Sequence, residues 1–411
     1  MMRSTILVGF GWAAGLAIAA MLSGEFAVPA KGAEAPVKIG VLTDLSGFAA
    51  DSGGAGVVAA VKMAVRDAGG AVLGQPIEIV QADTLNKPDS AAQTARRWFE
   101  VEGVDAIVGL PVTPVALAVQ NVARSQKKIL LINEGASTEL TGKQCSPYTV
   151  HFADDTNALA AGTARALVQE GNKDWFFLTA DFAFGHTMEE AASKVVTELG
   201  GHVVGRALHP LNATDYASPL LQAQQSSANV IAMANSAGDT INTIKQAAEF
   251  GVGRDGRQKL AGLLLFISDV HSLGLPVAQG LFVTTGFYWD EDENTRAFAK
   301  RFAAEFEGRM PTKAQANAYA EVKHYLVAIA AAKTKTPEPV MEAMRKMPID
   351  YFGRSASLRE DGRVLYDVAL YQVKSPAESK GPWDYYRKVR SIPARDAFLP
   401  ADPQACTFLK K

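Results

Sequence analysis

Short apolar runs alternate with amphipathic stretches along the first third of the chain. In the amphipathic stretches the apolar residues recur every three or four positions, which places them on one face of a helix. This pattern predicts strands at residues 37–42, 77–81, 106–109 and 129–132, and helices at residues 56–68, 89–100 and 114–125. Because parallel neighbours need crossover connections, the alternation predicts a parallel sheet with helices on both faces.

The same alternation starts again after His151. It predicts helices at residues 158–170, 187–199, 216–225 and 239–250, and strands at residues 175–179, 203–207, 230–234 and 260–267. We therefore expect an α/β fold in which two doubly wound parallel-sheet lobes follow one another.

The final third of the chain is less periodic. It predicts a strand at 280–285, helices at 295–307, 314–333 and 338–346, and strands within 364–373. These residues are too few for a third sheet, so we expect them to complete the two lobes. No long linker interrupts the chain, and the crossings between lobes are therefore expected to be short hinges.

Residues 1–30 have the pattern of an export signal. A positively charged start precedes the apolar run Leu7–Leu22, which is shorter than the roughly 20 apolar residues that a membrane span needs. The run therefore favours a cleaved signal peptide over an uncleaved anchor. Cleavage is expected after Ala30, because a cut after Ala35 would place Pro36 next to it.

Composition narrows the range of partners. Removing the signal leaves roughly 380 residues, which favours two domains over one. Charged residues make up 20% of the chain and the formal net charge is −2, so neither a nucleic acid nor a polyelectrolyte partner is expected. No later stretch predicts membrane insertion, and we expect a monomer. Cys145 and Cys406 are expected to pair after export, with two free or buried thiols as the alternative.

The loops that follow the strands of the first lobe are the expected ligand-binding segments, because ligands of doubly wound sheets bind beyond the carboxyl ends of the strands. The loop 43–54 is rich in glycine and hydroxyl groups, including Ser46 and Ser52. Thr113 precedes Pro114 at an expected helix start, where free N–H groups suit a carboxylate. The small residues Gly135, Ala136 and Ser137 would let a ligand approach the backbone. The alternative for Thr113 is a plain helix cap, and the alternative for the other two loops is a plain polar turn.

The second lobe offers an aromatic, an amide and an acidic side chain at the ends of its strands. Phe182 or Phe184 is expected to face the ligand, unless both belong to the core. Asn235 follows the next strand. Asp269 is the acid expected to pair with an ammonium group, and the alternative is that it caps the following helix.

Signatures of enzymes are weak in this sequence. The Gly-x-Gly-x-x-Gly pattern at 251–256 follows a predicted helix and precedes a predicted strand, the reverse of a dinucleotide site. The six histidines are scattered without a set of metal-ligand partners. We expect no catalysis, no cofactor and no metal, with an exported hydrolase as the enzyme alternative.

Several of these segments resemble one family in the same order along nearly the whole chain. They are residues 37–47, 76–80, 106–109, 135–141 and the run Asp181-Phe182-Ala183-Phe184-Gly185-His186. This order is similar to that of the leucine/isoleucine/valine-binding periplasmic solute receptors. The resemblance implies a type I two-lobed binding fold with three crossovers, a periplasmic location and delivery of the solute to an ABC-type permease.

The resemblance also implies roles for individual residues. Thr113 and Ser137, with the backbone of Gly135 and Ala136, would hold a carboxylate, while Asp269 would hold an amine. Phe184 stands where the family often has Tyr. The segment 145–149 resembles one at the first crossover and places the hinge near Val150 and His151.

On this basis lobe 1 would comprise residues 36–150 plus 284–345. Lobe 2 would comprise residues 151–283 plus 346–411, including the C-terminal tail.

Two departures from the family leave the ligand class open. Ser52 stands where some amino-acid receptors have a large aromatic residue, and Asn235 and Ser236 stand where they offer a Tyr. The expected ligand is a branched-chain or similar amino acid. The alternatives are an aromatic or other carboxylate without an amine, or a small amide, and a sensor that signals to a partner is a further alternative.

Overall fold

The computed structural model describes residues 35–253 and 256–410, so the predicted signal peptide and its cleavage site lie outside the described residues. The first sheet has the strand order β2-β3-β1-β4-β5-β6, and every neighbouring pair is parallel except β2 with β3. Its strands are β1 (Val37–Thr43), β2 (Ala71–Val72), β3 (Gln75–Asp83), β4 (Ala106–Gly109), β5 (Ile129–Ile132) and β6 (Thr149–His151).

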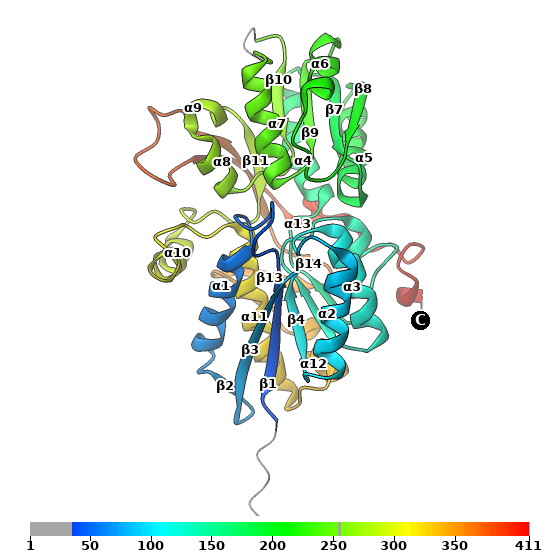
Figure 1. Cartoon of the computed structure of the whole chain (residues 1–411), viewed down its shortest axis with the longest axis vertical. Helices are drawn as coiled ribbons and strands as arrows, with labels where there is room; N and C mark the ends of the chain where they lie inside the picture. Colours follow the sequence, from blue (N-terminus) through cyan, green and yellow to red (C-terminus); the bar gives the residue numbers. More distant parts are fainter. Residues whose placement is uncertain (1–34, 254–255, 411) are drawn as a thin grey trace, which may run out of the picture. The chain divides into compact units, whose positions relative to one another are not determined.

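Helices cover both faces of this sheet because its strands are apolar on both sides. Val108 packs into the cluster formed with α1 (Gly54–Asp67) and α11 (Lys313–Ala332). Its neighbour Ile107 points to the opposite face and packs into the cluster formed with α2 (Pro88–Glu100) and α3 (Thr113–Ser125). Figure 1 shows these helices around the blue and cyan strands.

The second sheet is parallel throughout, with the strand order β10-β9-β7-β8. Its strands are β7 (Asp174–Ala180), β8 (His202–His209), β9 (Val230–Ala234) and β10 (Lys259–Gly262). Its helices are α4 (Thr156–Gln169), α5 (Ala183–Glu198), α6 (Ala217–Gln225) and α7 (Ala237–Glu249). The prediction of two doubly wound parallel sheets is therefore confirmed.

The prediction of a strand over 260–267 is wrong in its second half. Strand β10 ends at Gly262, and helix α8 (Ile267–Leu273) begins at the last residue of the apolar run. Residues 263–266 are buried although they form neither strand nor helix. A buried loop and a buried strand have the same apolar pattern, and this is why the sequence did not separate them.

The prediction that too few residues remain for a further sheet is also wrong. Two antiparallel three-stranded sheets are present: β11 (Phe282–Thr285) with β15 (Val368–Val373) and β16 (Tyr386–Ile392), and β12 (Ile349–Tyr351) with β13 (Arg354–Leu358) and β14 (Val364–Leu365). The remaining helices are α9 (Leu275–Ala278), α10 (Glu293–Glu305), α12 (Pro337–Lys346), α13 (Ala394–Ala397) and the short 3-10 helices at Thr138–Leu140 and Thr407–Lys410.

The exact division between the lobes stays a prediction, and the contacts refine it. Strand β11 packs against α4, whereas β12 contacts α11 and β13 contacts α12. Residues 349–365, which the prediction assigned to lobe 2, thus lie against helices assigned to lobe 1. The chain passes between the two sets of elements after β6, after β11 and after β14.

A single buried carboxylate joins these three passages. Asp154 lies in the first passage, after β6. It accepts a hydrogen bond from the backbone N–H of Gly286 in the second passage, at 3.2 Å. It also accepts one from the hydroxyl of Tyr366 in the third passage, at 2.9 Å. Its Oδ2 also pairs with Lys313 Nζ at 3.0 Å. Asp154 is only 3% exposed, so these partners replace the water that its charge would otherwise need.

Arg363, which is 1% exposed, holds the first and third passages together beside Asp154. It donates to the Ala153 carbonyl and to His151 Nδ1, the latter at 3.1 Å. Burial, and the nearby Arg363 charge, lower the pKa of His151 well below its ordinary value, so the ring is neutral. Its Nε2–H is then free to donate to the Gly135 carbonyl at 2.6 Å.

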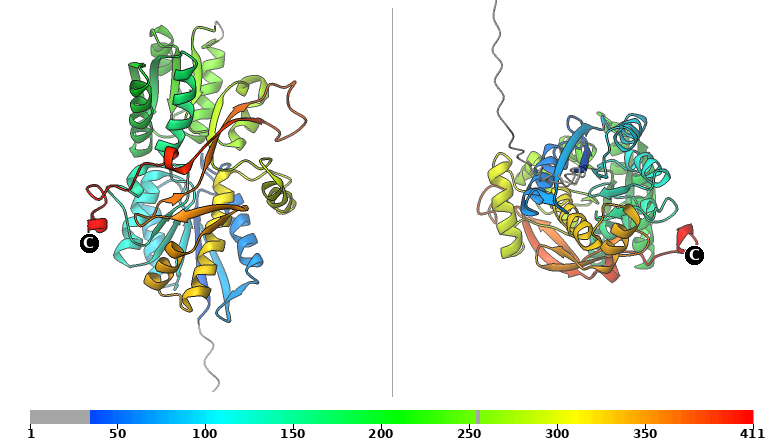
Figure 2. Two further views of the ribbon diagram at one scale, coloured as in Figure 1. Left: turned by 180° about the vertical axis from the view of Figure 1, so that it is seen from behind. Right: turned by 90° about the horizontal axis from the view of Figure 1, so that it is seen from below.

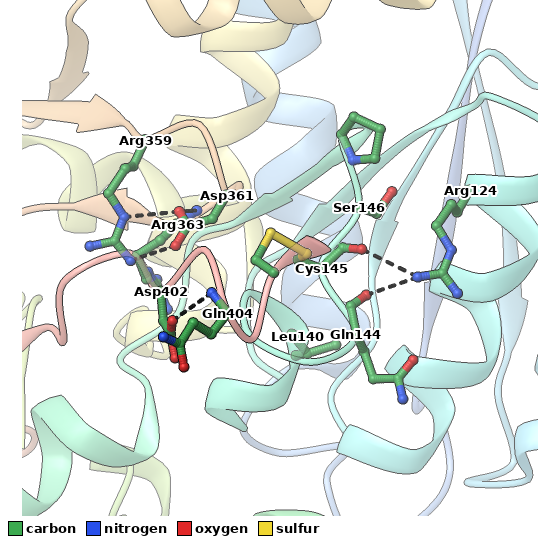
Figure 3. The surroundings of a disulfide bond; sticks show 12 residues. Arg124, Leu140, Gln144, Cys145, Ser146, Arg359, Asp361, Arg363, Asp402 and Gln404 are labelled. Atoms are coloured by element: carbon green, nitrogen blue, oxygen red, sulfur yellow. Dashed lines mark hydrogen bonds and ion pairs between the residues drawn. A yellow bond between two sulfur atoms is a disulfide. The ribbon is translucent and has the colours of Figure 1, made fainter. Parts of the chain in front are cut away.

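The C-terminal tail returns to the first sheet through a disulfide between Cys145 and Cys406, whose Cα atoms are 5.6 Å apart (Figure 3). The tail leaves β16, which belongs to the β11-β15-β16 sheet (Figure 2). Phe398 then packs 5.3 Å from the Tyr366 ring and lies over the Arg363 guanidinium. The tail therefore covers the residues that join the passages before the disulfide fixes it.

Replacing both cysteines by serine is expected to lower the free energy of unfolding by about 2–5 kcal/mol, because the bond closes a very long loop of the unfolded chain. Urea denaturation of the oxidised protein and the variant measures the difference. Reductant should bring the wild type to the stability of the variant and leave the variant unchanged; equal stability of the oxidised wild type and the variant would contradict the prediction.

Candidate functional site

A narrow pocket lies at the carboxyl ends of strands from both parallel sheets. Its walls come from the loops that follow β1, β4, β5, β7, β9 and β10. The lining residues are Phe48, Ala49, Pro111, Val112, Thr113, Glu134, Ala136, Phe182, Phe184, Ser236, Ala237, Leu264 and Phe266. This is the position at which doubly wound sheets bind ligands.

The backbone is unusual at two of these strand ends. Leu110 and Ala237 have positive φ angles of 71° and 50°, which side chains other than glycine seldom adopt. Gly109, before Leu110, has φ 126°, and a Cβ there would meet the Leu42 carbonyl at 2.3 Å. Such conformations are kept where the surroundings hold a sharp turn, and here they lead the chain from strand to pocket.

Three helices begin at the pocket. The first residues of α3 and α7, Thr113 and Ala237, line it, and so does Phe184 in the first turn of α5. The first N–H groups of a helix have no partner within the helix and carry partial positive charge, so this part of the wall suits an anion.

The predicted cap role of Thr113 is wrong by one position. Val112 is the N-cap of α3, no side chain caps it, and Thr113 is the first helical residue. Its side chain is only 2% exposed and belongs to the pocket wall.

Aromatic rings form much of the remaining wall. Phe182 and Phe184 both line the pocket, with their ring centroids 5.9 Å apart in a stacked arrangement. Phe48 and Phe266 contribute from other loops. The pocket therefore suits a ligand with an apolar body.

Glu134 is the ionisable residue of this wall. It is 8% exposed, and its Oε1 accepts a hydrogen bond from the Ser52 hydroxyl at 2.5 Å. Its Oε2 is buried and has no hydrogen-bond partner among the described residues. Burial, opposed by the Ser52 hydrogen bond and assisted by Asp44 and Asp269, raises the pKa of Glu134 to about 8.

Asp269 lies behind the wall, where it caps α8. Its Oδ2 accepts from the Phe266 backbone N–H at 2.8 Å, and Asp269 is 2% exposed. This contact is the helix cap that the sequence offered as the alternative role of Asp269. Burial raises the pKa of Asp269 to about 7, although the Phe266 hydrogen bond and Lys313 act in the opposite direction.

A smaller polar chamber adjoins the pocket and shares Glu134, Ala136, Leu264 and Phe266 with it. Its polar residues are Asn133, Glu134, Asp154, Lys313 and Asn317. Lys313 Nζ, which pairs with Asp154, lies 5.2 Å from the centre of the Phe266 ring. The same lysine thus touches both the joined passages and a wall of the pocket.

The structure brings some of the predicted site residues to the pocket. Thr113, Ala136 and Phe184 line it, and Ser52 stands behind Glu134. Gly135 lies next to Ala136 and is held by His151. The Ser137 hydroxyl lies 3.4 Å from the Thr187 hydroxyl on α5, where the two lobes meet.

Two predicted residues are placed elsewhere. Ser46 is exposed and donates to Asp83 Oδ2 at 2.6 Å, outside the pocket lining. Asn235 is fully buried and bonds to His209, Thr240 and Thr243 within its own lobe. Its neighbour Ser236 lines the pocket instead.

Several residues at the site were not predicted from the sequence, because their sequence context indicates a binding role only weakly. Glu134 is the second residue after β5, and an acid just beyond the end of a strand can indicate a binding site. Leu264 and Phe266 were hidden in the run taken for a strand. Lys313 gave no signal, because a lysine at a helix start is ordinarily a surface residue.

In the described ranges, no three His, Cys, Asp or Glu side chains come together in a way that would hold a metal ion. Within the same ranges, none of the helices combines the length and the apolar composition that a bilayer span requires.

Comparisons with known proteins converge on one class. The sequence model described as periplasmic binding protein matches residues 36–382. A curated relative, Leu/Ile/Val-binding protein homolog 6 of Brucella melitensis, is 28% identical over 63% of this chain and 67% of its own length.

Solved structures agree with this class. A periplasmic binding protein from Burkholderia mallei is 47% identical with a TM-score of 0.87, covering 90% of this chain and 98% of its own. A branched chain amino acid ABC transporter periplasmic ligand-binding protein from Burkholderia xenovorans is 39% identical with a TM-score of 0.79, covering 89% and 97%. A solute binding protein from R. palustris in complex with 4-hydroxybenzoate, at 21% identity and a TM-score of 0.79 over 88% and 98%, shares the fold.

Substituting Lys313 by Met should destabilise the protein by about 3–5 kcal/mol, because it leaves the buried charge of Asp154 without its cation. Urea denaturation measures this. Adding Asp154→Asn should recover part of the loss. Lys346→Met, which removes an exposed pair with Glu342, is the matched control and should leave the midpoint unchanged; a Lys313→Met midpoint equal to that of the control would refute the prediction.

Proposed function

Because this chain belongs to the family of periplasmic binding proteins, we propose that it binds a small carboxylate in the pocket between its two parallel sheets. Proteins of this family are exported to the periplasm, where they receive small solutes and deliver them to ABC transporter permeases. The observation that carries the proposal is that three helix N-termini and several apolar rings border one pocket.

The expected solute is a branched-chain or similar amino acid. The walls of Phe182, Phe184 and Leu264 suit an apolar side chain, and the start of α3 at Thr113 suits the carboxylate. The names of the similar proteins from Brucella and Burkholderia xenovorans point to the same class.

An aromatic carboxylate is the second candidate. Four phenylalanine rings, Phe48, Phe182, Phe184 and Phe266, line the pocket and could stack on a planar ligand. The R. palustris protein with the same fold binds such an acid.

Export itself also belongs to this proposal. Removal of residues 1–30 would leave a mature chain that begins at Lys31. The N-terminal sequence of the protein isolated from the periplasm tests this.

A thermal-shift screen of leucine, isoleucine, valine, benzoate and 4-hydroxybenzoate identifies the ligand class. A ligand at about 100 times its dissociation constant adds about 2.7 kcal/mol to the stability of the native state. We expect stabilisation by a branched-chain amino acid. Stabilisation by the aromatic acids alone would favour the second candidate, and no stabilisation by any of the five would contradict the proposal.

The variant Thr113→Val tests the carboxylate end of the pocket. Losing a hydrogen bond to a charged group costs about 1.5–3 kcal/mol, so affinity should fall about 10- to 100-fold. Titration calorimetry measures it. Thr197→Val, at an exposed position of α5, is the matched control and should bind as the wild type does; equal affinity of both variants would exclude this role for Thr113.

A further inference from the structure

We propose that the solute carries an ammonium group and that the carboxylate of Glu134 binds it. This inference depends on the proposed function, and it assigns the amine to a residue of the first lobe. It thereby chooses between an amino acid and a carboxylate without an amine.

The geometry of Glu134 leaves one oxygen for a ligand. Ser52 occupies Oε1, while Oε2 is buried and has no partner among the described residues. Gly53 packs against this oxygen, and a Cβ at that position would come within 2.3 Å of Oε2, so a side chain there would displace the carboxyl group. An unpaired buried acceptor in the wall of a pocket is costly for the empty protein, and a donor on the ligand removes that cost.

Asp269, the acid expected from the sequence, is less suited to this role. Its Oδ2 already accepts from the Phe266 N–H and it is absent from the pocket lining, whereas Glu134 belongs to that lining. Asp269 would act from behind the wall through its charge.

The charges that face Glu134 favour a cation. Asp44 acts from the loop after β1, Asp269 from α8, and Lys313 from α11. Lys313 is paired with Asp154, so its positive charge is already balanced. Two acids, Glu134 and Asp269, therefore lie at or behind this wall, beside a lysine that Asp154 already pairs. Burial raises the pKa of both carboxyl groups; Asp44 and Asp269 add to the rise at Glu134, and Lys313 opposes it.

Another part of the wall has the other polarity. The helix starts at Thr113, Phe184 and Ala237 present backbone N–H groups and partial positive charge. A pocket with an acidic residue at one part and helix N-termini at another matches a ligand with an ammonium and a carboxylate, which is an amino acid. An acid without an amine would leave Oε2 of Glu134 as it is in the empty pocket.

Binding of an ammonium group must then be linked to protons. The pKa of Glu134 is about 8, so at pH 7 most molecules of the empty protein hold a proton on this carboxyl group. An ammonium group requires the ionised form, and its binding should release about one proton at pH 7. Lowering the pH from 8 to 6 reduces the ionised fraction of Glu134 from about one half to about one hundredth, so affinity should fall about 50-fold.

The test compares ligands that differ only by the amine: leucine with 4-methylpentanoate, valine with 3-methylbutanoate, and phenylalanine with 3-phenylpropanoate. Titration calorimetry at pH 7 in two buffers of different ionisation enthalpy gives both the affinity and the proton release. The wild type should bind the amino acid of at least one pair at least 10-fold more tightly and release about one proton. Glu134→Gln, which mimics the protonated side chain, should abolish that difference and the release.

Glu321→Gln is the matched control. Glu321 is 1% exposed, has no partner for either oxygen among the described residues and has a pKa raised well above its ordinary value by burial, but it lies outside the lining of the pocket and of the polar chamber. This variant should keep the affinity and the proton release of the wild type.

The outcomes separate this inference from the proposed function. If ligands bind but no pair shows a preference for the amino acid, or if Glu134→Gln keeps the preference for the amine, the amine inference is wrong while the carboxylate receptor stands. If none of these six ligands and neither benzoate nor 4-hydroxybenzoate binds, both are wrong.

Discussion

The carboxylate of Asp154 is the interaction on which the arrangement of this protein depends. Three separate passages of the chain connect its two parallel sheets, and Asp154 takes hydrogen bonds from the other two passages while it pairs with Lys313. A charge buried to this degree needs all of its partners, since nothing else replaces water. One side chain therefore ties together segments more than 200 residues apart in sequence, and Arg363 and the Cys145–Cys406 disulfide bind neighbouring parts of the same region.

This joined region is continuous with the pocket. Lys313 reaches from Asp154 to the Phe266 ring, and His151 reaches from Arg363 to the carbonyl of Gly135, next to the pocket residue Ala136. Movement of one lobe relative to the other would have to act on these contacts. In a protein that closes around its solute, such contacts give the ligand a physical route to the hinge.

The pocket combines requirements that conflict in a stable core. Apolar rings and helix starts surround Glu134, whose carboxyl group has no partner for one oxygen. Positive φ angles at Leu110 and Ala237 place the strand ends around it. An unpartnered buried oxygen and positive φ angles at residues other than glycine both lower stability. Their occurrence in one pocket is typical of a binding site.

The sequence by itself determined the two parallel sheets, because alternating apolar runs and amphipathic helices leave few other ways to bury both strand faces. It also located the strand-end loops, and within them Thr113, Ala136 and Phe184. Only the tertiary structure decided that residues 263–266 form a pocket wall, since a buried loop and a buried strand are equally apolar. Only the tertiary structure showed that Ser46 lies outside the pocket lining, that Asp269 caps α8 and that Lys313 pairs with Asp154. Pairing of distant polar groups depends on how the elements pack, and it leaves no periodic pattern in the sequence.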